Sequence, residues 1–249
     1  MAARGRKRQG AAALFPHDRP LKFDDKLVLN QWILSLFEVP SFERLTENMK
    51  GPELEGFDED NVSRYYRFLR AQLFDRAELP FDVLLGYDQN IVRHWLAITE
   101  RRNRQGQPLY PKYFQYLSLL FAEIYLDRYF RNPKGLLEAL HRQVEAFNTG
   151  KVQRDQLQPY KRTDLNKLAF WSATGSGKTL VMHVNILQYR HYLELHGQGR
   201  RLNRIILLTP NEVLSHQHLE EFRFSGLEAE LFSKDGRGLF TGQDRKSVV

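Results

Sequence analysis

The stretch LAFWSATGSGKTLVMHV, residues 168–184, decides the fold. Its first four residues, 168–171, are apolar and predict a short strand. A Gly-rich turn follows, and then an apolar-periodic segment from Lys178 to His196 predicts a helix that ends at Gly197. A strand, a turn and a helix in immediate succession are typical of the opening unit of an α/β domain.

The turn SATGSGKT fits the specific end of the phosphate-loop pattern with Gly177, Lys178 and Thr179, while Ser172 replaces the pattern's first glycine. Gly175 and Gly177 permit backbone angles and close approaches that a side chain would block. Successive N–H groups at a helix N-terminus bind phosphate oxygens, a lysine here reaches the β- and γ-phosphates, and a threonine hydroxyl binds magnesium. A glycine turn that merely happens to carry Lys and Thr is the alternative, but the flanking strand and helix favour nucleotide binding.

We therefore expect ATP and Mg²⁺ as cofactors. Lys178 is the expected catalytic residue and Thr179 the expected magnesium ligand. The expected cofactor-binding residues are Ala173, Thr174, Gly175, Ser176, Gly177, Lys178 and Thr179.

Strands and helices are predicted to continue to alternate after the loop. RIILLT, 204–209, is a continuous apolar run of the kind buried in parallel sheets, and 227–232 is a further strand candidate. Between them, 211–222 predicts a helix with Asn211 as its cap. The sequence therefore predicts a partial α/β RecA-like phosphate-loop domain with an incomplete parallel sheet over 167–249.

Helical periodicity dominates the chain before residue 150 and predicts an accessory domain over 23–150. Its aromatic residues lie on the apolar stripes, which favours a buried core over exposed platforms for stacking bases. Expected helix starts are Asp24 with Asp25, Asn61 as a cap, and Pro111 at a first helical position. The predicted helices cover 24–38, 58–74, 88–102, 111–130 and 133–147.

One polar segment precedes the helical domain, and another separates it from the phosphate-loop domain. Residues 1–22 predict a basic, disordered tail. Residues 151–166 are polar, contain Pro159, and predict a linker.

The composition and charge of the chain bear on its partners and exclude some kinds of site. The net charge of +7 and the pI of about 9.5 permit a polyanionic partner without requiring one. The absence of cysteine excludes disulfides and cysteine-ligated metals and suits the cytoplasm. No apolar run approaches the roughly 18 residues of a membrane span, so we expect no membrane partner. The HQH of 216–218 is read as a solvated helix face, not a zinc site.

ATGSGKT after a strand, followed by LLTPNEVLSHQHLEEF at 207–222, resembles the first two motifs of superfamily 2 DEAD/DEAH-box helicases. The closer resemblance is to the ATPase (Res) subunit of type I and type III restriction enzymes, over roughly residues 155–232. It implies a nucleic-acid-dependent ATPase that acts on DNA, with methyltransferase or specificity partners of a restriction-type system. It also implies phosphate-backbone contacts by Thr209, Pro210 and Asn211; an ordinary strand-to-helix turn capped by Asn211 is the alternative.

Two departures from that family pattern bear on activity. Lys161 follows Pro159 and Tyr160 where the family has a glutamine that reads adenine, and Gln158 is out of register, which puts this route to adenine specificity in doubt. No Asp-Glu pair follows either strand candidate after the loop, and Asp235 lies in a turn-like SKDGRGLF. We therefore expect an N-terminal fragment that binds nucleotide weakly or not at all and does not hydrolyse it.

Two other functional classes stay open on the sequence. A nucleic-acid or protein binding module could use the helical domain as its working part. A small-molecule kinase shares the phosphate loop, but the basic segment 200–204 is too short to indicate the arginine-rich lid that kinases use.

Overall fold

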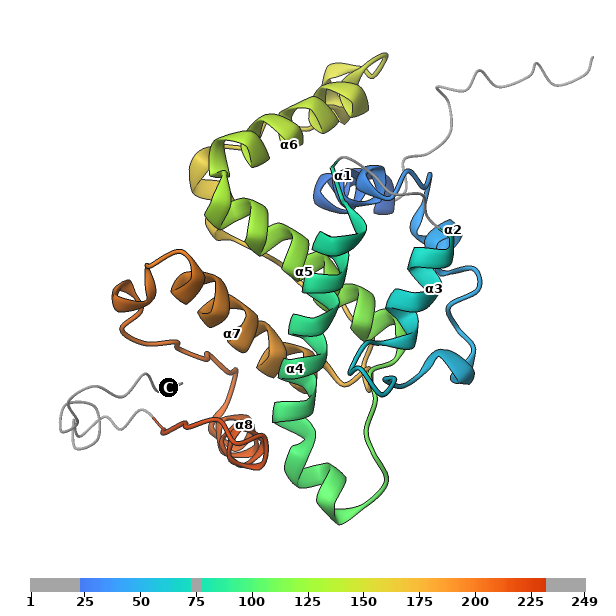
Figure 1. Ribbon diagram of the computed structural model, residues 1–249. Coiled ribbons are helices and arrows are strands. Elements are labelled where there is room, and N and C mark those ends of the chain that lie inside the picture. Colours follow the sequence, from blue (N-terminus) through green and yellow to red (C-terminus); the bar gives the residue numbers. More distant parts are fainter. Residues whose placement is uncertain (1–22, 73–77, 232–249) are drawn as a thin grey trace, which may run out of the picture.

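The computed structural model describes residues 23–72 and 78–231, and within these ranges the chain is built from helices packed around one core (Figure 1). The predicted tail 1–22, the end of the 227–232 segment and Asp235 lie outside the described residues. The helices confirm the predicted helical periodicity. They are α1 (Val28–Leu36), α2 (Phe42–Thr46), α3 (Arg64–Gln72), α4 (Phe81–Gln105), α5 (Tyr113–Arg131), α6 (Pro133–Asn148), α7 (Lys178–Leu195) and α8 (Glu212–Phe224).

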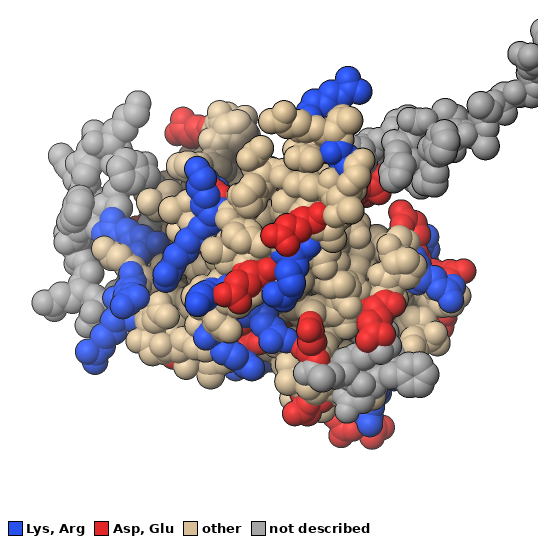
Figure 2. All heavy atoms as spheres, turned by 90° about the horizontal axis from the view of Figure 1, so that it is seen from above, with Lys and Arg blue, Asp and Glu red and all other residues tan. Residues whose placement is uncertain are grey.

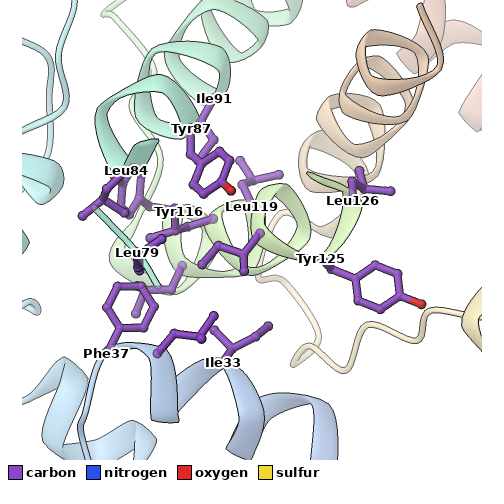
Figure 3. Close-up of a cluster of buried hydrophobic side chains, with 14 of the residues drawn as sticks. Ile33, Phe37, Leu79, Leu84, Tyr87, Ile91, Tyr116, Leu119, Tyr125 and Leu126 are labelled. Atoms are coloured by element: carbon purple, nitrogen blue, oxygen red, sulfur yellow. The ribbon is translucent and has the colours of Figure 1, made fainter. Parts of the chain in front are cut away.

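Helix α5 runs through the middle of the core, with α1 and α4 on either side of it (Figure 3). Ile33 and Phe37 approach it from the α1 segment, and Tyr87 and Ile91 approach it from α4. Most of the aromatic residues on the predicted stripes are buried, which confirms their assignment to the core. They are Trp32, Phe37, Tyr65, Tyr66, Trp95 and Tyr125.

Several predicted helix starts were wrong by a few residues. Asp24 and Asp25 form a 3-10 turn instead of capping α1. Asn61 adopts a left-handed conformation with a φ of 55°, and Ser63 caps α3, because its hydroxyl accepts the N–H of Tyr66 at 3.0 Å. Pro111 precedes α5, whose N-cap is the next residue.

The predicted parallel sheet is absent from the described residues, so the partial α/β RecA-like domain is corrected to an all-helical architecture there. Phe170 and Leu168 line a cavity of about 280 Å³ between α5 and α7 instead of joining a sheet. In the segment 205–209, half-buried and exposed residues alternate.

The predicted sheet was wrong because an apolar run predicts burial but does not by itself predict strand pairing. Such a run shows a tendency toward burial, whereas a parallel strand also needs a ladder of backbone hydrogen bonds to neighbouring strands. Ile205 and Ala229 are isolated bridge residues, and no longer ladder extends from them in the part of the chain that the structure describes. Trp171, Ile206 and Leu208 are consequently 90%, 66% and 87% exposed.

Residues 151–166 are docked along α5 and α6. The side chain of Asn148 forms two hydrogen bonds with the backbone of Leu157, each 2.8 Å long. The hydroxyl of Tyr125 donates to the carbonyl of Leu165 at 2.6 Å, and Leu165 is itself buried. The segment that enters the phosphate loop is therefore held on the helical core.

Helix α7, which begins with Lys178, packs against α4 and α5 (Figure 1). A buried polar network joins the three helices at Glu123 of α5, whose side chain is fully buried. One carboxylate oxygen accepts from Asn90 at 2.6 Å and from Gln188 at 2.7 Å, and the other accepts from the Tyr192 hydroxyl at 2.6 Å. Because buried polar groups are costly without partners, this network fixes the position of α7 relative to α4 and α5.

Helix α8 docks on α4 through a second polar cluster. Arg102 donates to Glu221 at 2.5 Å and to the hydroxyl of Ser225 at 2.9 Å. Nδ1 of His183 lies 2.8 Å from the same hydroxyl, and the His183 ring stacks on Phe222. Burial lowers the pKa of His183 to about 4, so the imidazole is neutral near neutral pH.

Candidate phosphate-binding site

The turn between Trp171 and α7 has the backbone conformation that its glycines were expected to permit. Gly175 and Gly177 have φ values of 77° and 72°, in the left-handed region. Gly177 is the N-cap of α7, so Lys178 and Thr179 are the first two residues of an 18-residue helix. The N–H groups at the start of a helix have no intrahelical partner and attract anions.

The two glycines are required for different reasons. A Cβ at Gly175 would meet no atom within 4 Å, so only its backbone conformation favours glycine. A Cβ at Gly177 would lie 2.4 Å from Nε2 of Gln115, so a side chain here would also displace the end of that glutamine.

The ammonium group of Lys178 lies over the turn. Its Nζ donates to the carbonyl of Ala173 at 2.8 Å and lies 3.5 Å from that of Ser172. The N–H of Ser176 bonds the same Ala173 carbonyl at 3.3 Å, which closes the turn. Residues 172–175 are exposed, so an anion can reach the turn from solvent.

Gln115 is a contact of this turn that the sequence analysis missed. It donates from Nε2 to the Ser176 carbonyl at 2.9 Å, although it belongs to α5 and is far away in sequence. It sits as a polar residue in the helical pattern of 111–130, and nothing in that pattern marks it. Only the packing of α5 on α7 brings it to the turn.

Thr209, Pro210 and Asn211 lie at the entry to α8. The carboxamide oxygen of Asn211 accepts the N–H of Leu214 at 2.9 Å, which confirms Asn211 as the helix cap. The hydroxyl of Thr209 donates to the Asn211 carbonyl at 3.0 Å and lies 2.5 Å from the hydroxyl of Ser215. Among the described residues, no hydrogen bond or ion pair joins these three residues to the phosphate loop.

Comparison with known proteins found one family model that matches part of the chain. Residues 136–247 match the family model described as type III restriction enzyme, res subunit. This segment is related to the res subunit family. A search of curated proteins and a search of solved structures each found no match.

The res-related segment begins within α6, before the boundary predicted at residue 150, and it includes the phosphate loop, α7 and α8. The relation supports a helicase-like ATPase of superfamily 2, a class that uses ATP and Mg²⁺ and interacts with nucleic acid. The suspected relation to restriction ATPases is thereby confirmed.

On the face in Figure 2, Lys and Arg side chains predominate toward the left and Asp and Glu toward the right, with both signs mixed between them. Among the residues described, no group of three or more His, Cys, Asp or Glu could hold a metal ion, and no helix is long and apolar enough to cross a membrane.

Proposed function

We propose that the res-related segment contains the phosphate-binding part of an ATP site. The backbone of Ala173 to Gly177 would surround the phosphates, Lys178 would reach the β- and γ-phosphates, and the hydroxyl of Thr179 would bind Mg²⁺. The observation that carries the proposal is a left-handed Gly177 that caps α7 directly before Lys178 and Thr179. The family match over the same residues supports it.

The position of Lys178 fits this role. Its ammonium group is exposed and bonds the carbonyls of Ala173 and Ser172, which belong to the turn that would hold the phosphates. Phosphate oxygens carry more negative charge than carbonyls and would compete for the same donor. The lysine can therefore exchange its contacts without a movement of the helix.

We further propose that the segment works in DNA binding in a longer restriction-type protein, with methyltransferase or specificity partners. Asn211 and its neighbours Thr209 and Pro210 are the proposed backbone contacts. The oxygen of the Asn211 carboxamide is used by the cap. Its NH₂ group is therefore the donor that would meet a DNA phosphate.

We do not propose that this chain hydrolyses ATP. The segments that end at Thr209 and Ser233 are not followed by the acidic pair that magnesium and the attacking water need. We expect no ATP turnover by the purified chain, with or without DNA. Turnover that disappears in Lys178→Ala would contradict this expectation.

Calorimetric titration with ATP, with and without Mg²⁺, tests the binding role of each residue. Lys178→Ala should abolish binding under both conditions. Thr179→Ala should bind ATP alone as the wild type does but should lose the gain in affinity that Mg²⁺ gives. Equal Mg²⁺ dependence in Thr179→Ala and the wild type would contradict the assigned metal ligand.

A further inference from the structure

Gln115 is buried, with 7% of its surface exposed, and both ends of its carboxamide are engaged. Its Oε1 accepts the N–H of Lys112 at 2.8 Å and so caps α5. Its Nε2 donates to the carbonyl of Ser176 at 2.9 Å. Since the two bonds lie at opposite ends of one planar group, the cap on α5 fixes the direction of the donor toward the phosphate loop.

The bond to Ser176 determines which way the next amide points. The carbonyl of Ser176 and the N–H of Gly177 belong to one trans peptide, because the described chain has no cis peptide bond. In a planar trans peptide these two groups point in opposite directions. A carbonyl held toward Gln115 therefore directs the Gly177 N–H away from the buried glutamine.

The close approach of Gln115 to Gly177 shows that this contact is tight. An added Cβ at Gly177 would lie 2.4 Å from Nε2, so a side chain there would have to displace the end of this glutamine. Helices α5 and α7 also form the most extensive helix pair in the described chain. The contact is therefore set by rigid elements and not by the exposed turn alone.

We propose that Gln115 is a positioning residue for the phosphate loop. It holds the Ser176–Gly177 peptide so that the Gly177 N–H is presented to the phosphates of ATP. This inference rests on the proposed nucleotide binding and adds to it a residue from outside the loop and outside the res-related segment.

Two substitutions separate this role from the helix cap. Gln115→Glu keeps an oxygen for the Lys112 N–H but loses the donor to Ser176. Gln115→Met loses both and adds no charge. Gln143→Met on α6 is the matched control, since the Gln143 side chain makes a single exposed hydrogen bond of 3.3 Å to Ser35.

The test measures binding of a fluorescent ATP analogue with Mg²⁺, thermal unfolding, and the shift of the Gly177 amide signal in NMR spectra on addition of Mg–ATP. Because one hydrogen bond contributes a modest free energy, both Gln115 variants should bind roughly three- to tenfold more weakly. Gln115→Glu should unfold cooperatively, at a lower temperature than the wild type because its buried carboxylate faces a carbonyl, and should lose the ATP-dependent shift of Gly177. Raising the salt concentration should not restore binding by Gln115→Glu, which excludes simple charge repulsion.

Wild-type affinity in both variants, with binding still abolished by Lys178→Ala, would overturn the role of Gln115 alone. If the wild type failed to bind Mg–ATP, or if Lys178→Ala bound as well as the wild type, both the proposed function and this inference would fall. If Gln115→Met fails to fold, Gln115→Glu still decides the question.

Discussion

Replacing Glu123 by glutamine should remove a large part of the pH dependence of folding stability. Burial raises the pKa of Glu123 to about 7, from an ordinary value of 4.5, although the hydrogen bonds from Tyr192, Gln188 and Asn90 oppose the shift. The folded state therefore binds a proton more tightly than the unfolded state. Stability from this group is fully present below about pH 4.5 and is lost as the pH rises through about 7.

The size of this effect follows from the shift. One pKa unit corresponds to about 1.4 kcal/mol, so ionisation of Glu123 should lower the free energy of unfolding by roughly 3 kcal/mol between about pH 5 and pH 8. Glutamine cannot ionise, and its oxygen can still accept from Asn90 and Gln188. Its NH₂ group can donate to the Tyr192 hydroxyl, which can turn to act as the acceptor.

Urea unfolding followed by circular dichroism gives the free energy of unfolding at each pH. Histidines act in the opposite direction: burial lowers the pKa of His94 to about 3 and of His183 to about 4, so stability from these groups falls as the pH drops below 6.5. The difference between Glu123→Gln and the wild type cancels these contributions. It should move by roughly 3 kcal/mol in favour of the variant from about pH 5 to pH 8.

The exposed Glu100 of α4 provides the control, because Glu100→Gln should change stability by less than about 0.5 kcal/mol at any pH. Parallel pH profiles for Glu123→Gln and the wild type would contradict this prediction. They would mean that the pKa of Glu123 is the same in the folded and the unfolded chain.

Two further pairs of substitutions test local features of the site. Gly175→Ala should cost about 1 kcal/mol of stability, because alanine is strained in the left-handed backbone conformation. Gly177→Ala should cost more, because its added Cβ also meets the side chain of Gln115. Equal losses of stability in thermal unfolding would contradict this close approach. Asn211→Ala should lower stability by about 1 kcal/mol and speed hydrogen exchange of the Leu214 amide, because the helix cap is lost. Asn211→Ser should restore most of the stability and most of the protection from exchange. Unchanged exchange in Asn211→Ala would show that the cap is absent.

Local patterns in the sequence predicted most helices and the phosphate turn. Apolar residues at helical spacing identify α5, α6 and α7, because each of these helices buries a stripe on the core. The left-handed glycines follow from the loop motif, and the cap of α8 follows from Asn211. The start of α4 was predicted at residue 88, so the turns of the helix before that residue were missed. Gly86 interrupts the helical pattern there, but it lies on an exposed face of the helix.

Features that depend on distant parts of the chain could not be predicted in the same way. The apolar run at 204–209 indicated a strand, but a strand exists only if other segments pair with it, and no such ladder forms among the described residues. Gln115 reaches the loop because α5 packs on α7, which no local pattern encodes. The division into 23–150 and 167–249 stays a prediction.

The most direct test of the phosphate site uses Trp171, which is exposed and lies just before the loop, while Trp32 and Trp95 are buried. Energy transfer from Trp171 to a methylanthraniloyl-labelled ATP should report binding with Mg²⁺. We expect a weak, saturable signal for the wild type and for Lys134→Ala, which removes another exposed lysine from the first turn of a helix. Lys178→Ala should give no saturable signal. Equal signals from Lys178→Ala and the wild type, or none from the wild type, would contradict it.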